Sequence, residues 1–213
     1  MRLSETNRNV FINCPFDADY RACFEALLFT VMVSGYRVRC ALEDDDAANI
    51  RFDKLRRLIR ESPRTIHDLS RTELGENELP RFNMPFELGL AMGAKHFGGP
   101  KRRKNTALIM VRERYALPAH LSDLGGNDPA AHGGDPHNIM RIVSRYLHAT
   151  PAGRLLPGPQ SYVAGFRKFK EDFPGIAAGL EWHAAEIDPF ANYRVYLLFL
   201  AEFVRTANRV SAD

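Results

Sequence analysis

Short apolar runs of strand type alternate with stretches of helical periodicity through the first half of the chain, and this alternation constrains the fold more than any other feature. Strands that alternate with helices form right-handed crossovers, which place the strands parallel in one sheet with helices on both faces. We therefore predict an α/β fold with a parallel sheet. Strands are expected at residues 9–13, 36–42, 65–70 and 106–111, and helices at residues 20–34, 49–61 and 83–92.

The second half of the chain has a different pattern. Residues 123–136 are rich in Gly and Asp and predict a loop, and three helical patterns follow at about residues 137–148, 160–172 and 192–208. There is no internal repeat. We accordingly divide the chain into an α/β domain at residues 1–115 and a loop-and-helix extension at residues 116–213 that packs on it.

Composition and charge exclude several classes of protein. With 45% hydrophobic residues among 213, the chain can bury a substantial core. A net charge of +3 is too small to predict nucleic-acid binding. The three cysteines, Cys14, Cys23 and Cys40, form no C-x-x-C motif and predict reduced thiols. The N-terminus has no apolar signal region and the run at residues 26–33 is too short to span a bilayer, so we expect a cytoplasmic protein that does not enter membranes.

The polar candidates for a functional site follow predicted strands or begin a predicted helix. The carboxyl ends of parallel strands meet at one edge of a sheet, where ligands collect in such folds. We therefore expect the candidate residues to converge at this edge. The candidates are Asn13, Cys14, Phe16, Asp17, Glu43, Asp68, Ser70, Asn83 and Glu87.

Glu87 is the candidate with the clearest chemistry. Asn83 suits the N-cap of the third helix and Pro85 its first turn, so Glu87 lies one turn further, on the same face as Asn83. The helix dipole favours an ionised carboxylate there. Such a group can stabilise an oxocarbenium-like ribose or attack its anomeric carbon. The alternative is that Glu87 only offsets the dipole.

Four segments in order, V-F-I-N-C-P-F-D, the acidic loop at 43–46, I-H-D-L-S and N-M-P-F-E-L-G-L-A, resemble the ground plan shared by Toll/interleukin-1 receptor (TIR) domains and nucleoside deoxyribosyltransferases. The resemblance covers about residues 9–111. It implies a flavodoxin-like, doubly wound parallel sheet. It also implies that Glu87 is the catalytic glutamate, that Asp68 contacts the sugar or base, and that residues 13–17 line the nucleotide pocket.

The same resemblance implies an activity. It suggests an N-glycosidase that cleaves NAD or a related nucleotide as substrate, without a separate cofactor or metal, and a role in phage defence, which bacterial relatives often have. Two alternatives stay open: a non-catalytic nucleotide-binding or assembly module, and a nucleoside deoxyribosyltransferase. The acidic loop and the helical C-terminal half depart from a minimal TIR domain and leave the substrate unassigned.

Three further hypotheses come from local patterns. His67 and Asp68 are neighbours in a strand and must point to opposite faces, and we favour Asp68 as the one that faces the site. The loop that carries Asp123, Asp128 and His132 lacks zinc-site spacing and is interpreted as a structured lid or a hydrogen-bonded turn, of unassigned role. The acidic loop at 43–46 and the basic loop at 101–104 should lie at opposite ends of the sheet, which favours a head-to-tail homo-oligomer unless both loops are simply solvated.

Overall fold

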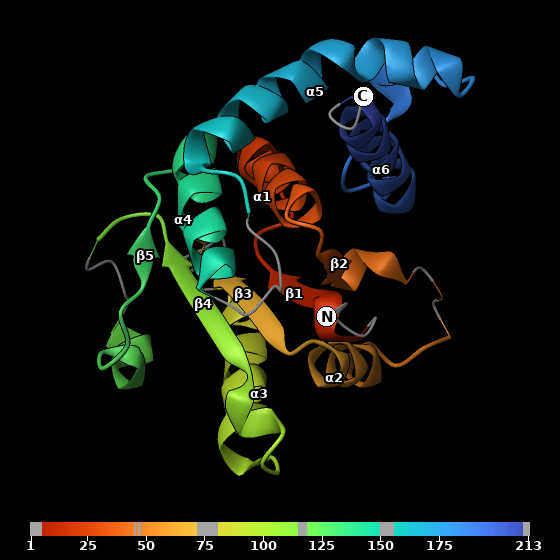
Figure 1. The fold of residues 1–213 in the computed structure, drawn as a ribbon. Coiled ribbons are helices and arrows are strands. Elements are labelled where there is room, and N and C mark those ends of the chain that lie inside the picture. Colours follow the sequence, from red (N-terminus) through yellow and green to blue (C-terminus); the bar gives the residue numbers. More distant parts are fainter. Residues whose placement is uncertain are drawn as a thin grey trace.

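A computed structural model of the chain describes residues 6–44, 46, 48–71, 81–114, 119–149 and 156–210. Its centre is a parallel sheet of five strands in the order β2-β1-β3-β4-β5 (Figure 1). This is the order of flavodoxin-like folds, so the predicted fold class is confirmed. The strands are β1 (Asn9–Asn13), β2 (Arg37–Cys40), β3 (Arg64–Asp68), β4 (Thr106–Val111) and β5 (Ala130–Ala131).

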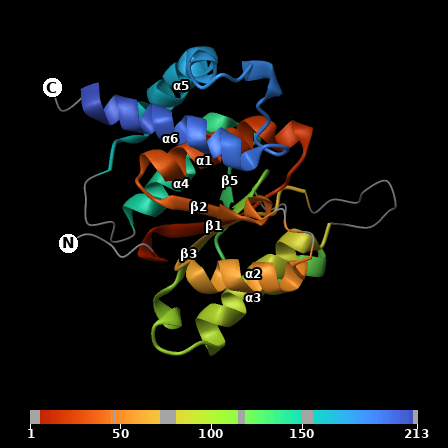
Figure 2. The same ribbon diagram turned by 90° about the vertical axis from the view of Figure 1, so that its right-hand side faces the viewer.

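Helices cover both faces of the sheet. Figure 2 shows α2 and α3 on one face and α1, α4, α5 and α6 on the other. The helices are α1 (Arg21–Val33), α2 (Arg51–Glu61), α3 (Asn83–Phe97), α4 (Pro136–His148), α5 (Pro159–Gly179) and α6 (Tyr193–Val210). Short 3-10 turns join them: η1 (Thr6–Arg8), η2 (Ala18–Tyr20), η3 (Ala41–Glu43), η4 (Arg102–Lys104), η5 (Ala119–Leu124) and η6 (Ala184–Glu186).

The first crossover shows how local sequence sets these elements. Every residue of β1 is buried, as expected of a central strand covered on both faces. Helix α1 ends where Gly35 adopts φ 75°, the left-handed conformation that favours glycine. The amide groups of Gly35 and Tyr36 then bond back to carbonyls in the last turn of α1, and the chain returns into β2.

The observed elements differ from the prediction in several places; helix α3, for example, runs to Phe97 rather than to residue 92, and β3 ends at Asp68 rather than at residue 70. Strand β5 was missed because it is only two residues long and adjoins a Gly-rich turn. Helix α5 continues through Pro174 to Gly179, because Phe169 and Ala177, on either side of the proline, are both buried in the core. The N-cap of α3 is Phe82, without a side-chain hydrogen bond, and Asn83 is instead the first helical residue.

The C-terminal helices share one core with the sheet. Phe24 and Phe29 of α1 belong to the same buried cluster as Tyr162 of α5 and Tyr196 of α6. Helix α4 packs along α1, and β5 pairs with β4. The last strand of the sheet and the helix beside it thus lie C-terminal to the division placed at residue 115, and the extension completes the fold.

Candidate functional site

Glu87 is a buried carboxylate in the second turn of α3. The residue is 5% exposed, and its carboxylate makes no hydrogen bond or ion pair with any residue that the structure describes. Burial raises the pKa of Glu87 to about 7, although the positive charge of Arg51 acts to lower it. The sequence favoured an ionised side chain because of the helix dipole. Desolvation by burial is instead the largest effect on this carboxyl, and with a pKa of about 7 both protonation states are populated near neutral pH.

The raised pKa of Glu87 predicts a pH-dependent cost to stability. Its carboxyl group ionises at about 4.5 in the unfolded chain and about 7 in the folded one, so the folded state loses stability as pH rises through this window. Glu87→Gln removes this cost. We expect the variant to be more stable than the wild type at pH 8, by up to about 3 kcal/mol, and equally stable at pH 4.

Urea unfolding at the two pH values measures this difference. The exposed Glu113 provides the control, because Glu113→Gln should change stability little at either pH. Equal stability of the wild type and Glu87→Gln at pH 8 would contradict the raised pKa.

Asn13 joins the end of β1 to the start of the helix that carries Glu87. Its side-chain amide donates to the carbonyl oxygen of Met84 at 2.8 Å and lies 3.0 Å from Nδ1 of His67. Because the Asn13 amide is a donor, Nδ1 of His67 accepts and the proton is on Nε2. Burial lowers the pKa of His67 to about 3, so this imidazole is neutral. The pair therefore fixes the first turn of α3, one turn before Glu87.

His67 and Asp68 point to opposite faces of the sheet, as strand alternation predicted. His67 contacts Asn13 on the side covered by α3, whereas Asp68 contacts Tyr20 on the side covered by α1. The side chain of this pair that shares a face with Glu87 is therefore His67. Alternation along a strand predicted the opposition, but the sequence did not reveal which helix covered which face.

Asp68 is the centre of a buried polar cluster, which we call the Asp68 network. The carboxylate accepts hydrogen bonds from the hydroxyl of Tyr20 at 2.5 Å, the backbone amide of Ser70 at 2.9 Å and the hydroxyl of Ser70. Nε2 of His132 lies 3.1 Å from Asp68 and 2.7 Å from Oγ of Ser70. The amide of Gly134 donates to Nδ1 of His132 at 3.0 Å, so the proton is on Nε2.

The geometry of this network indicates a structural role. Burial acts to raise the pKa of Asp68, but the hydrogen bonds from His132, Ser70 and Tyr20 outweigh it and hold the pKa below its ordinary value. In a Ser-His-Asp relay the imidazole bridges the other two residues through different nitrogens, whereas here Nε2 faces both. Asp68 is 0% exposed, so a sugar or base would reach it only by displacing these bonds.

We predict that Asp68→Asn destabilises the protein by several kcal/mol. The amide brings two N–H groups into a site whose neighbours are mostly donors, and it removes the charge that strengthens their bonds. Urea unfolding checks this, with Asp53→Asn as the matched control, since the Asp53 side chain is 59% exposed. An Asp68→Asn protein as stable as the control would show that the network contributes little.

The remaining candidates already have partners within the chain. Cys14 is buried. Burial raises the pKa of its thiol well above the usual value, and the charges of Asp68 and Glu87 raise it further. Phe16 packs edge-on against Phe24, with ring centroids 5.4 Å apart. Asp17 accepts from the amide of Tyr20 at 3.1 Å and forms ion pairs with two arginines, Arg71 and Arg81.

Of the last two candidates, Asn83 is exposed and Glu43 is half-buried. Asn83 is exposed at the start of α3, and Glu43 forms an ion pair with Arg39 at 2.7 Å. Asp123 and Asp128 are exposed, whereas His132 is 1% exposed and belongs to the Asp68 network. Of these three loop residues, His132 is the one that belongs to the Asp68 network.

The acidic loop is partly neutralised within the chain. Asp44 pairs with Arg57 at 2.8 Å, while Asp45 lies outside the described residues. The basic loop, with η4 at residues 102–104, precedes β4 and so lies at the amino end of the sheet. The head-to-tail homo-oligomer remains a prediction.

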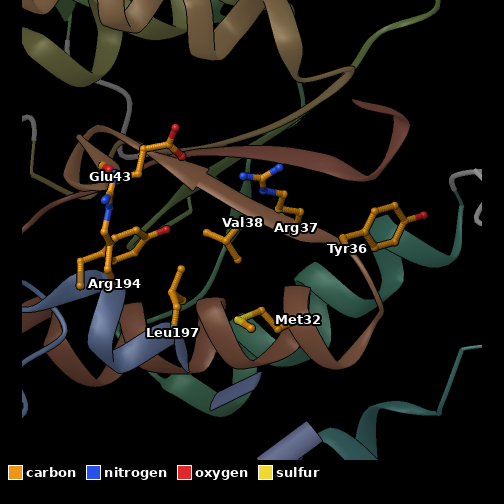
Figure 3. Close-up of a pocket in the computed structure, with 8 residues that line it drawn as sticks. Met32, Tyr36, Arg37, Val38, Glu43, Arg194 and Leu197 are labelled. Carbon is orange, nitrogen blue, oxygen red and sulfur yellow. Dashed lines mark hydrogen bonds between the residues drawn. The ribbon is translucent and has the colours of Figure 1, made fainter. Parts of the chain in front are cut away.

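A cavity of about 400 Å³ lies between β2 and α6 (Figure 3). Its lining consists of Met32, Tyr36, Arg37, Val38, Glu43, Tyr193, Arg194 and Leu197. Glu43 is the one sequence candidate among them, and its backbone carbonyl accepts a hydrogen bond from Arg194. The cavity is therefore separate from Glu87.

Metal-binding clusters and membrane-spanning helices are absent from the part of the chain that the structure describes. No group of three or more His, Cys, Asp or Glu residues there is placed to hold a metal ion. None of the helices described is both long and apolar enough to cross a bilayer.

The sequence was also compared with known proteins. No protein-family model and no curated protein matches the chain. A proposal for its function therefore depends on the geometry around Glu87.

Proposed function

We propose that the chain cleaves the N-glycosidic bond of NAD or a related nucleotide, with Glu87 at the ribose. The observation that carries this proposal is the buried carboxylate of Glu87, which has no partner among the described residues and a pKa near 7. Such a group costs stability, and residues that cost stability without a compensating contact are typical of functional sites. The flavodoxin-like topology supports the location, because ligands bind at the carboxyl ends of the strands.

In the proposed reaction, water replaces the base at the anomeric carbon of the ribose. The bond between this carbon and the ring nitrogen breaks, its electron pair stays with the base, and positive charge develops on the sugar. Ionised Glu87 stabilises that charge in a site with little water. A water oxygen then bonds to the carbon and releases a proton. A substrate with a cationic base, such as NAD, would itself favour the ionised form of Glu87.

The test is incubation of the purified protein with NAD and a panel of nucleosides and nucleotides, with free base followed by chromatography. We expect release of base from at least one compound, and kcat/KM should rise with pH through about 7 as Glu87 ionises. Transfer of the sugar to an added second base would instead favour the deoxyribosyltransferase alternative. Binding without release would favour the non-catalytic one.

A further inference from the structure

Four exposed apolar side chains occur at the N-terminal ends of α2 and of α3, the helix that carries Glu87. We call these four residues, of which three are phenylalanines, the aromatic rim. Its members are Ile50 (68% exposed), Phe52 (43%), Phe82 (53%) and Phe86 (54%). Water-exposed aromatic rings are costly to maintain, and a group of them next to a polar site marks a surface that binds something.

The two helices bring the rim together. The rings of Phe52 and Phe86 have centroids 6.1 Å apart at an interplanar angle of 37°. Phe82 is one helical turn from Phe86, whose amide donates to the carbonyl of Phe82 at 2.9 Å. The guanidinium of Arg56 lies over Phe52, 5.9 Å from the ring centroid. Two tilted rings with open surface thus form a platform of the kind on which planar groups stack.

The rim borders Glu87 on both helices. Phe86 immediately precedes Glu87 on α3, and Arg51, which immediately precedes Phe52 on α2, acts electrostatically on the Glu87 carboxylate. In an N-glycoside the base is attached directly to the sugar carbon that reacts. A base whose ribose is at Glu87 would therefore lie within one sugar ring of this carboxylate, and Phe86 is the residue next to Glu87 on α3.

We propose that the aromatic rim binds the leaving base of the nucleotide by stacking on Phe52 and Phe86. This inference rests on the proposed function for the position of the ribose. Stacking on aromatic side chains accepts any base, because every base has a π-face. The rim therefore accounts for recognition of an aromatic ring rather than of one particular base.

Equilibrium binding tests the rim separately from catalysis. In the Glu87→Gln protein, titration calorimetry compares nicotinamide mononucleotide with ribose 5-phosphate, which lacks the base. The double variant Phe52→Ala, Phe86→Ala should weaken binding of the mononucleotide at least about tenfold and leave ribose 5-phosphate unchanged. The double variant Phe52→Trp, Phe86→Trp should bind the mononucleotide about as tightly as the protein with Phe at both positions. Phe97→Ala is the matched control, because Phe97 is 93% exposed at the other end of α3.

Each outcome separates the two proposals. Rim-dependent binding of the mononucleotide, in a wild-type protein that releases no base from any compound, supports the rim and rejects the proposed function. Cleavage that depends on Glu87 but is indifferent to the double variant rejects the rim alone. The rim is also rejected if neither probe binds, or if the double variant weakens binding of both probes equally. It is rejected as well if the only effect of the double variant is that a dimer dissociates in sedimentation, because the rim would then be a contact between copies of the chain.

Discussion

Glu87→Gln should lower the rate of base release at least about 100-fold at pH 8. Glutamine keeps the size of the side chain but cannot carry the negative charge that stabilises a cationic sugar, and contacts of this kind are typically worth about 3 kcal/mol or more in the transition state. KM should change much less, because the rim and the backbone around Glu87 are left intact. The measurement is steady-state release of base on the best compound of the panel.

A fall in activity could also come from damage to the fold, and two comparisons exclude this. Glu113→Gln alters an exposed carboxylate and should retain wild-type turnover. The pH-dependent stability of Glu87→Gln gives the second comparison, since the variant is expected to be more stable than the wild type where the enzyme is assayed. Wild-type turnover in Glu87→Gln would remove this residue from the catalytic assignment.

Truncation after Val111 should abolish cooperative folding. The fragment would lack β5 and the helices α4, α5 and α6, which cover one face of the sheet. The buried side chains lost from the shared core include Ile139, Met140, Val143, Tyr162, Phe169, Tyr196 and Phe199. Each buried side chain of this size contributes about 1.5–3 kcal/mol, and a whole domain is stable by only about 5–15 kcal/mol.

Circular dichroism during heating, with the full chain measured in parallel, tests the truncation. We expect the fragment to be insoluble or to lose its signal without a sharp transition. A soluble fragment with a cooperative transition would show that residues 112 onward form a separate unit, despite the core that α1 shares with α5 and α6.

The sequence was most informative where structure depends on local pattern. Strand β4 was predicted at its observed bounds because an apolar run of β-formers is bracketed by polar residues. The end of α1 was predicted from the glycine at position 35, which adopts the left-handed conformation that favours this residue type. Strand β5 could not be recognised, since two alanines have no periodicity and their pairing with Met110 and Val111 is a property of the sheet.

The candidate site was predictable as a set of positions but not as a set of contacts. Strand alternation and topology predicted that Asn13 and Asp68 lie at the ends of strands β1 and β3, and that Glu87 lies early in α3. No local pattern indicated that His132 would meet Ser70 across 62 positions of sequence, or that this bond would help to close the surroundings of Asp68. The pKa of Glu87 was missed for a related reason: the helix dipole can be inferred from position in α3, whereas the desolvation that opposes it depends on what packs over the side chain.

The central position of β1 has a consequence for how the chain acquires its structure. Both neighbours of β1 come later in the sequence, because Val10 pairs with Val38 of β2 and with Arg64 of β3. The ring of Phe29, on the helix that follows β1, packs against Phe203 of α6 at a centroid distance of 6.1 Å. Contacts between residues so distant in sequence slow folding, because the chain loses entropy in closing long loops before the contacts form. Strand β1 and helix α1 are synthesised before β2, β3 and α6, so they stay incompletely packed until α6 has been made.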